Sequence, residues 1–322
     1  MKKLHNFIIT IGNVYLDHNA YEVESNGFNE LKAGKEYFAK QYETVLGGSA
    51  VNFARQARNL GLRVAFVGQV GDDEEGKEIK RLLLKERINS DLVNTVKGET
   101  TSAAFNMILS HNGEFVGVHW GSASRTLQQK YIDPSHPLFQ QATAVYFGGT
   151  AKQGEIFQNF PTVLARLQNQ GIRTIIDPNR FPVLQDNASR DILLESLQYA
   201  DCYLPNAEEL KQTTGEQDID RAIQIALKRG VKMVVVKRGG EGCIVCSQHQ
   251  QLVIPGFYVV PKTTVGAGDA FNAGFVTQLL AEKPLLECGR YANAVAGIKV
   301  GENKTATHID VTEFIKNHSV SS

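Results

Sequence analysis

The segment from Thr264 to Phe275 contains residue types that suit the binding and transfer of a phosphoryl group. Its small residues Gly266, Ala267 and Gly268 let backbone N–H groups converge on an anion where a helix begins, and a helix N-terminus carries a partial positive charge. We expect the following carboxylate, Asp269, to accept the proton of an acceptor hydroxyl while these amides stabilise the transferred charge. A simpler interpretation is that Asp269 only caps the helix, and this segment alone leaves both open.

Two segments near the N-terminus suit a polyol. Gly47 and Gly48 permit close approach of the backbone to a ligand, and the amide of Asn52 can both donate and accept hydrogen bonds. The carboxylate of Asp17, which follows the first apolar run, can accept from two vicinal hydroxyls. A lone loop Asp is more often simply solvated, so its residue type alone does not assign a role.

Two segments in the second half of the chain combine polar or basic residues with a helix start or a glycine turn. Asn206 and Glu209 are three residues apart and share one face of a helix, although a helix cap with a first-turn Glu fits them equally well. Lys237 opens a glycine-rich turn that contains Gly239 and Gly242 and directly follows an apolar run. By itself this turn is a weak signal.

Apolar runs of strand length alternate with amphipathic stretches along most of the chain. Such runs are typical of a parallel sheet buried on both faces, and the alternation predicts an α/β fold in which a doubly wound, mostly parallel sheet is sandwiched by helices. The predicted strands are 7–11, 64–67, 144–147, 172–176, 202–204 and 233–236, and the predicted helices include 50–60, 75–86, 156–170, 219–229 and 270–280.

Two segments interrupt this alternation. Residues 18–45 and 100–119 are predicted to form strands, the second segment as a hairpin around Asn112-Gly113. We interpret them as a small β lid on a single domain that spans residues 1–322, with a polar tail from Asn317.

The order of these motifs resembles that of the ribokinase-like (PfkB) carbohydrate kinases over nearly the whole chain. The resemblance implies an ATP-dependent kinase in which Asp269 is the base and Gly266, Ala267 and Gly268 form the anion hole. It further implies that magnesium is organised by Asn206 and Glu209 through water. The remaining implied contacts are Asp17, Gly47, Gly48 and Asn52 with the acceptor, and Asn206, Lys237, Gly239, Gly242 and Asn293 with ATP.

Thr263 is a departure from the family pattern, which usually has Asp at this position. The missing carboxylate makes a potassium site uncertain, and one hypothesis is that Lys304 replaces the charge of the cation. Arg180, after a predicted strand, is a candidate contact for phosphate or acceptor, and a solvated arginine is an equal alternative. An acceptor that already carries phosphate would need basic residues, for which Arg55, Arg58 and Arg125 are candidates.

The composition narrows the possible partners. The 34 basic and 34 acidic residues cancel, so no global field favours nucleic acid or a membrane surface. No apolar run approaches the length of a membrane span, and the four cysteines are too few for a disulfide framework, which together predict a cytoplasmic protein. Cys243 and Cys246 would point to opposite faces of a strand and favour core packing over a metal site. A homodimer through exposed lid strands is a further hypothesis.

Several rival functions lack their motifs. The first apolar run is not followed by Gly-x-Gly-x-x-Gly, there is no P-loop sequence, and the eight histidines have no ligand spacing. A sugar or nucleoside sensor on the same scaffold stays open as an alternative, but it would not need the retained Asp269. Among acceptors, a simple furanose or ketose sugar is our first prediction and a nucleoside the second.

Overall fold

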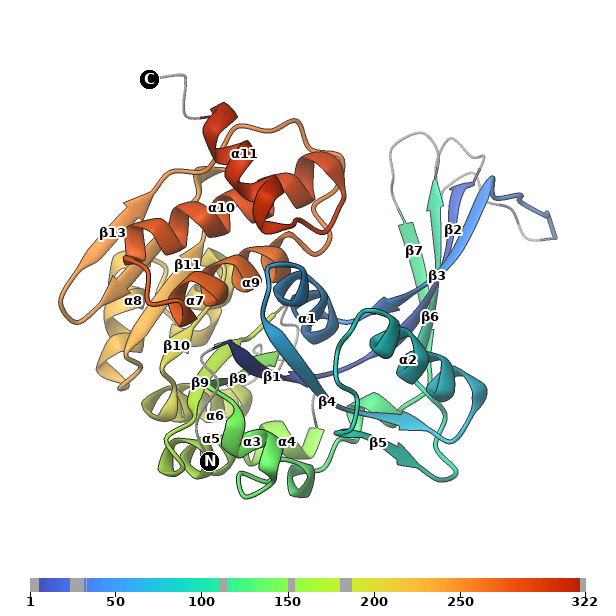
Figure 1. Ribbon diagram of the computed structural model, residues 1–322, viewed down its shortest axis with the longest axis horizontal. Helices are drawn as coiled ribbons and strands as arrows, with labels where there is room; N and C mark the ends of the chain where they lie inside the picture. Colours follow the sequence, from blue (N-terminus) through green and yellow to red (C-terminus); the bar gives the residue numbers. More distant parts are fainter. Residues whose placement is uncertain are drawn as a thin grey trace.

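The computed structural model describes residues 6–23, 32, 34–109, 115–149, 154–179 and 187–318. A large central sheet in this part of the chain has the strand order β13-β12-β11-β10-β9-β8-β1-β4-β5 (Figure 1). Its strands are β1 (Phe7–Gly12), β4 (Arg63–Gly71), β5 (Val93–Val96), β8 (Ala144–Gly148), β9 (Arg173–Asp177), β10 (Cys202–Tyr203), β11 (Met233–Lys237), β12 (Cys243–Ser247) and β13 (Gln251–Ile254).

The sheet is parallel from β11 to β5, and the pairs β11–β12 and β12–β13 are antiparallel. Its central strands are mostly apolar because both faces are covered: Ile9 and Ile11 enter one core cluster, and Ile8 enters the other. The predicted α/β fold with a mostly parallel sheet is confirmed. Cys243 and Cys246 also lie in different clusters, as strand alternation predicts.

Helices cover the two faces of the sheet separately. The core of one face contains residues from α1, α2, α9 and α10, and the core of the other contains residues from α3 to α8. The helices are α1 (Ser49–Asn59), α2 (Glu74–Lys85), α3 (Pro137–Gln141), α4 (Gly154–Gln158), α5 (Phe160–Asn169), α6 (Asn187–Ser196), α7 (Ala207–Thr214), α8 (Ile219–Lys228), α9 (Ala267–Leu280), α10 (Leu285–Glu302) and α11 (His308–His318).

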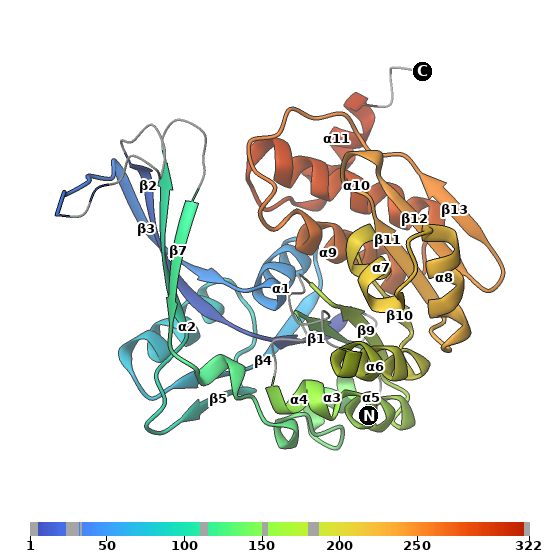
Figure 2. The ribbon, with the colours of Figure 1, turned by 180° about the vertical axis from the view of Figure 1, so that it is seen from behind.

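A second, four-stranded sheet projects from the body of the molecule, as Figure 2 shows from behind. Its order is β3-β2-β6-β7, with β2 (Tyr15–Val23), β3 (Gln41–Gly47), β6 (Ala103–Leu109) and β7 (Phe115–Trp120). The antiparallel pair β6–β7 is the predicted hairpin, although its Asn112-Gly113 turn lies outside the described residues. We call this the lid sheet, and whether it closes over a ligand stays a prediction.

Two of the predicted helix boundaries were wrong. The stretch predicted as one helix from 156 to 170 is two helices, α4 and α5, interrupted at Asn159, which is followed within two residues by Pro161. Helix α9 begins at Ala267 rather than at 270, because Gly266 adopts the left-handed conformation and caps it. Among the described helices, none combines the length and apolar character that crossing a membrane requires.

Candidate active site

Two helix N-termini and one strand end converge beside the central sheet. Helix α1 packs against α9, and the hydroxyl of Thr10 on β1 holds α1 by donating to the carbonyl of Ala50 at 3.1 Å. Gly48, which precedes α1, has φ 109°, and a Cβ there would overlap the carbonyl oxygen of Asn13. Only glycine suits this turn, which brings the start of α1 to the start of α9.

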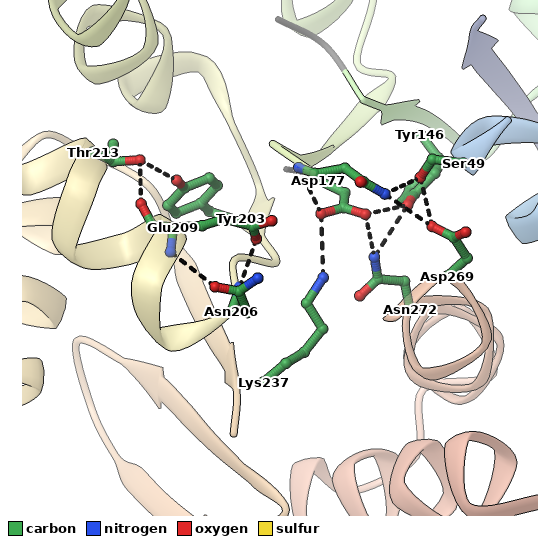
Figure 3. A network of polar contacts seen from close by, with 11 residues as sticks. Ser49, Tyr146, Asp177, Tyr203, Asn206, Glu209, Thr213, Lys237, Asp269 and Asn272 are labelled. Carbon is green, nitrogen blue, oxygen red and sulfur yellow. Dashed lines mark hydrogen bonds and ion pairs between the residues drawn. The ribbon is translucent and has the colours of Figure 1, made fainter. Parts of the chain in front are cut away.

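Asp269 is buried in the first turn of α9 and accepts three hydrogen bonds, of which Figure 3 shows the one from Ser49. Its oxygens accept from Ser49 Oγ at 2.5 Å, Asn52 Nδ2 at 3.0 Å and Asn179 Nδ2 at 3.2 Å. Burial and the nearby charge of Asp177 raise the pKa of Asp269 to about 7, against the hydrogen bonds from Ser49 and Asn52, which lower it. The helix-cap interpretation was wrong, because Gly266 is the N-cap and the side chain of Asp269 contacts other elements.

A second buried carboxylate, Asp177 at the end of β9, organises the centre of the site (Figure 3). It accepts from Tyr146 Oη at 3.0 Å, Asn272 Nδ2 at 2.8 Å and Lys237 Nζ at 3.2 Å. Burial lowers the pKa of Lys237, but the charges of Asp177, Glu209 and Asp269 and the hydrogen bond to Asp177 together outweigh burial and raise the pKa. Lys237 therefore stays an ammonium group whose charge is offset by Asp177.

The predicted magnesium residues form a capping box at the start of α7. The amide of Asn206 donates to Glu209 Oε2 at 2.8 Å, and the amide of Glu209 donates to Asn206 Oδ1 at 2.8 Å (Figure 3). The cap interpretation is therefore confirmed. A bridge between Asn206 and Lys237 brings this cap to the end of β11. The Nζ atom of Lys237 lies 3.7 Å from where a Cβ on Gly268 would stand. Lys237 is therefore close both to the α7 cap and to the turn of residues 266–268, which we call the anion turn.

The glycine turn after β11 is packed against the chain that follows β13. Gly239 has φ 58° and Gly242 has φ 94°, and a Cβ on Gly242 would overlap the carbonyl oxygen of Ile254. Asn293 on α10 donates to the carbonyls of Ile254 and Pro255 at 3.3 and 3.0 Å. The structure thus brings Gly239, Gly242 and Asn293, all predicted to contact ATP, to the end of β13. There Asn293 holds the backbone of Ile254 and Pro255.

Asp17 lies on the face of the lid sheet that carries polar side chains. A Cβ on Gly47 would overlap its carboxylate, so the glycine gives this carboxylate its space. Burial raises the pKa of Asp17 to about 6. By strand register the same face carries Asn19, Asn106 and His119, and Asn106 Nδ2 donates to Asn19 Oδ1 at 2.8 Å.

Sequence reasoning assigned no role to five side chains of this network, although the segment that contains Asp177 and Asn179 resembles the family pattern. Ser49 and Asn179 contact Asp269. Asp177 contacts Lys237, and Tyr146 and Asn272 donate to Asp177. Ser49 and Asn272 lie inside the recognised motifs, and Asp177 and Asn179 follow a predicted strand. Their position in the sequence was therefore the only signal that they belong to the site. Arg180 lies outside the described residues.

The contacts of Lys304 do not support the hypothesis that it replaces the charge of a cation near Thr263. Lys304 is half exposed and pairs with Glu302 at 2.7 Å and Asp310 at 3.2 Å, so two carboxylates already offset its charge. We therefore do not assign it the charge of a cation. The hydroxyl of Thr263 accepts from the amide of Val265 at 3.2 Å. Among the described residues, no three His, Cys, Asp or Glu side chains are grouped to hold a metal ion.

Comparison with known proteins agrees with this arrangement. A model of the pfkB family of carbohydrate kinases matches residues 5–311. A ribokinase of Haemophilus influenzae is 28% identical over 296 residues, which cover 89% of this chain and 92% of the relative. A nucleoside kinase of Methanothermobacter thermautotrophicus is 28% identical and covers 86% and 85%, respectively.

Solved structures share the fold at low sequence identity. An E. coli protein solved with ATP and Mg²⁺ superimposes with a TM-score of 0.84 at 21% identity, covering 99% of this chain and all of that chain. Arabidopsis thaliana ribokinase with ribose and ATP gives a TM-score of 0.76 at 23% identity, covering 98% of this chain and 99% of that chain. The chain belongs to the pfkB family of carbohydrate kinases and is an ATP-dependent kinase.

Proposed function

We propose that this kinase transfers the γ-phosphate of ATP to a hydroxyl of an uncharged sugar of the ribose or fructose type, with Asp269 as the base. The observation that carries the proposal is the buried carboxylate of Asp269, held at the N-terminus of α9 with a pKa raised to about 7. A carboxylate with that pKa is ionised in part at neutral pH and is basic enough to accept a proton from an attacking hydroxyl.

In the mechanism, the acceptor oxygen attacks the γ-phosphorus, and the bond from that phosphorus to the β–γ bridging oxygen breaks. The hydroxyl proton passes to Asp269, which Ser49, Asn52 and Asn179 hold in place by hydrogen bonds. Backbone amides of residues 266–268 stabilise charge on the transferred group, as expected for preorganised donors at a helix N-terminus. Positioning and charge stabilisation supply most of the catalysis in phosphoryl transfer.

The polar face of the lid sheet favours an uncharged acceptor. It presents Asp17, Asn19 and Asn106, whose oxygens and amides suit the hydroxyls of a sugar. The four lid strands contain no Lys or Arg, and Arg55 on α1 is paired with Glu86 at 2.9 Å. A phosphate on the acceptor would find no cationic side chain on these strands, which counts against a hexose phosphate.

A nucleoside acceptor is the second candidate. The rings of Tyr15 and His119 meet edge to face on the polar side of the lid, with centroids 6.1 Å apart. Both lie beside the strand positions of Asp17 and Ala104, where aromatic side chains suit stacking on a base. Trp120, by contrast, stacks on His18 on the opposite face.

We propose ATP with magnesium as the donor. Magnesium keeps several waters and is often held by one or two protein oxygens plus phosphates, so the Asn206 and Glu209 pair fits a hydrated ion. When bound, the ion offsets charge on the β- and γ-phosphates. Lys237, Gly239, Gly242 and Asn293 are the proposed nucleotide residues on this side.

We propose that the lid sheet both covers the acceptor and joins two subunits. Its outer face, opposite Asp17, exposes apolar and aromatic side chains, and Val118 at its centre is 61% exposed. These side chains come from β3, β6 and β7 and share one face of the sheet, which suits a second copy of the same sheet. The residues of this outer face are Tyr42, Phe105, Val116, Val118 and Trp120.

We propose the cytoplasm as the compartment. All four cysteines are free and buried, and burial raises the pKa of Cys243 and Cys288 to about 12. Unreactive core thiols without a disulfide suit a reducing environment.

The proposal is tested by ADP release with magnesium and ATP over a panel of sugars, sugar phosphates and nucleosides, with Asp269→Asn alongside and potassium present or absent. We expect turnover with an uncharged sugar and its loss by about 100-fold or more in Asp269→Asn, while binding of acceptor and ATP persists. A near-normal rate in Asp269→Asn would refute its role. Binding without turnover across the whole panel would instead favour a sensor.

A further inference from the structure

The side chain of Lys299 on α10 lies across the turn that begins α9. Its Cε is 3.5 Å from where a Cβ on Gly266 would stand, and Asn52 Nδ2 is 3.8 Å from the same point. The Lys299 side chain is partly buried, and its ammonium group donates to Asn303 Oδ1 at 2.9 Å. Asn303 caps α10 in the left-handed conformation, so the end of this helix fixes the direction of the lysine.

The charge of this lysine has no close counterpart. Among the residues that the structure describes, no carboxylate lies within ion-pair distance of Lys299, whereas Arg55, Lys237 and Lys304 each have one. Burial and the charge of Arg55 lower the pKa of Lys299, while the charge of Asp269 raises it.

The surroundings of Lys299 favour an anion. The positive end of α9 lies beside Lys299 and Arg55. Glu86 offsets the charge of Arg55, and Asp269 is the carboxylate whose charge acts on Lys299. A cation that is partly removed from water and lacks a counter-charge is unfavourable, and a bound anion relieves this cost.

We propose that Lys299 is a catalytic residue whose ammonium group contacts the phosphoryl group seated on the amides of residues 266–268. This proposal rests on the proposed function and deepens it. Lys299 and Lys237 would then flank the transferred group from opposite sides, since Lys237 Nζ approaches Gly268 as Lys299 Cε approaches Gly266. In the transition state the negative charge is spread over the three equatorial oxygens of the transferred group, and a fixed ammonium group beside them stabilises it.

The test compares Lys299→Met, Lys299→Arg and the matched control Lys304→Met. Methionine keeps most of the aliphatic packing and removes the charge, and arginine keeps the charge. We measure kcat and KM for ATP, and the equilibrium binding of ADP and of a non-hydrolysable ATP analogue. Thermal unfolding of each variant reports whether it folds like the wild type.

For Lys299→Met we expect kcat to fall by about 10²-fold, as on removal of one donor to a developing charge. Affinity for the ATP analogue should fall by about tenfold and affinity for ADP should be unchanged, because only the analogue places a phosphoryl group on the α9 turn. Lys299→Arg should retain part of the rate, and ammonium ions should partly restore Lys299→Met where sodium ions do not. Lys304→Met should stay within about twofold of the wild type, because its charge is already offset.

Two results would overturn the proposal. One is a folded Lys299→Met protein with kcat and analogue affinity within about twofold of the wild type. The other is an equal loss of ADP and analogue affinity, which would assign Lys299 to general packing or electrostatics. If the wild type shows no acceptor-dependent turnover at all, the proposed function fails, but the comparison of ADP with the analogue still tests Lys299.

Discussion

Ser49→Ala should move the acid limb of the pH–rate profile to higher pH. Burial and the charge of Asp177 raise the pKa of Asp269 to about 7, and the hydrogen bond from Ser49 is one of the contacts that oppose this rise. A hydrogen bond to a charged group contributes about 1.5–3 kcal/mol, and about 1.4 kcal/mol corresponds to one pKa unit. Because Asn179 still donates to the same oxygen, we expect the lower part of this range, an increase of about one unit.

The assay is kcat/KM for the acceptor as a function of pH, since this quantity reports ionisations of the free enzyme. The wild-type midpoint should lie at about 7. With a midpoint about one unit higher, Ser49→Ala should be about fivefold slower at neutral pH and should recover above about pH 9, where Asp269 is again ionised. The control is Ser196→Ala, which removes a fully buried hydroxyl that donates to Ile192 on α6, on the other face of the sheet from α9.

The refuting result is specific. A Ser49→Ala profile with an unchanged midpoint and a lower plateau would mean that Ser49 positions the acceptor or the helix and does not set the basicity of Asp269. A shift to lower pH would contradict the direction of the hydrogen-bond effect altogether.

Two further predictions follow from the same structure. Asp269→Asn should stabilise the protein at and above neutral pH. The pKa of Asp269 in the folded protein is about 7, above the usual 3.8. The stabilisation that comes from its protonated form is therefore complete below pH 3.8 and is lost as the pH rises to about 7. The gain in the free energy of unfolding is at most about 4 kcal/mol. Equal thermal stability of Asp269→Asn and the wild type at pH 8 would contradict this prediction. Val118→Glu on the outer lid face should convert the proposed dimer to a monomer in light scattering, and an unchanged mass would count against this interface.

The sheet and most helices could be predicted because their signals are local. The run from Ile8 to Ile11 is apolar except for Thr10, which is typical of a strand covered on both faces, and both core clusters use its isoleucines. The boundaries that failed depended on backbone geometry. The left-handed Gly266 sets the start of α9 three residues before the apolar pattern does.

The candidate site could be predicted only as far as its motifs reach. Asp269 and Ser49 form a hydrogen bond across 220 residues of sequence, and Asn179 reaches the same carboxylate across 90. No periodicity relates such positions, since the fold alone brings the starts of α1 and α9 to the end of β9. The motif residues were named from resemblance, while the contacts that set the pKa of Asp269 required the three-dimensional arrangement.

The two lysines near the anion turn show why charge has to be assigned from contacts. Lys237 stands in a recognised glycine motif, yet Asp177 already offsets its charge at 3.2 Å and the pair anchors Tyr146 and Asn272. Lys299 stands in no motif, and its partner is a neutral amide oxygen. A phosphoryl group gains more from a cation whose charge is not yet neutralised, because it displaces no existing ion pair. We therefore propose that Lys299 is the cation whose charge is available to the transferred group, while Lys237, already paired with Asp177, flanks that group from the other side.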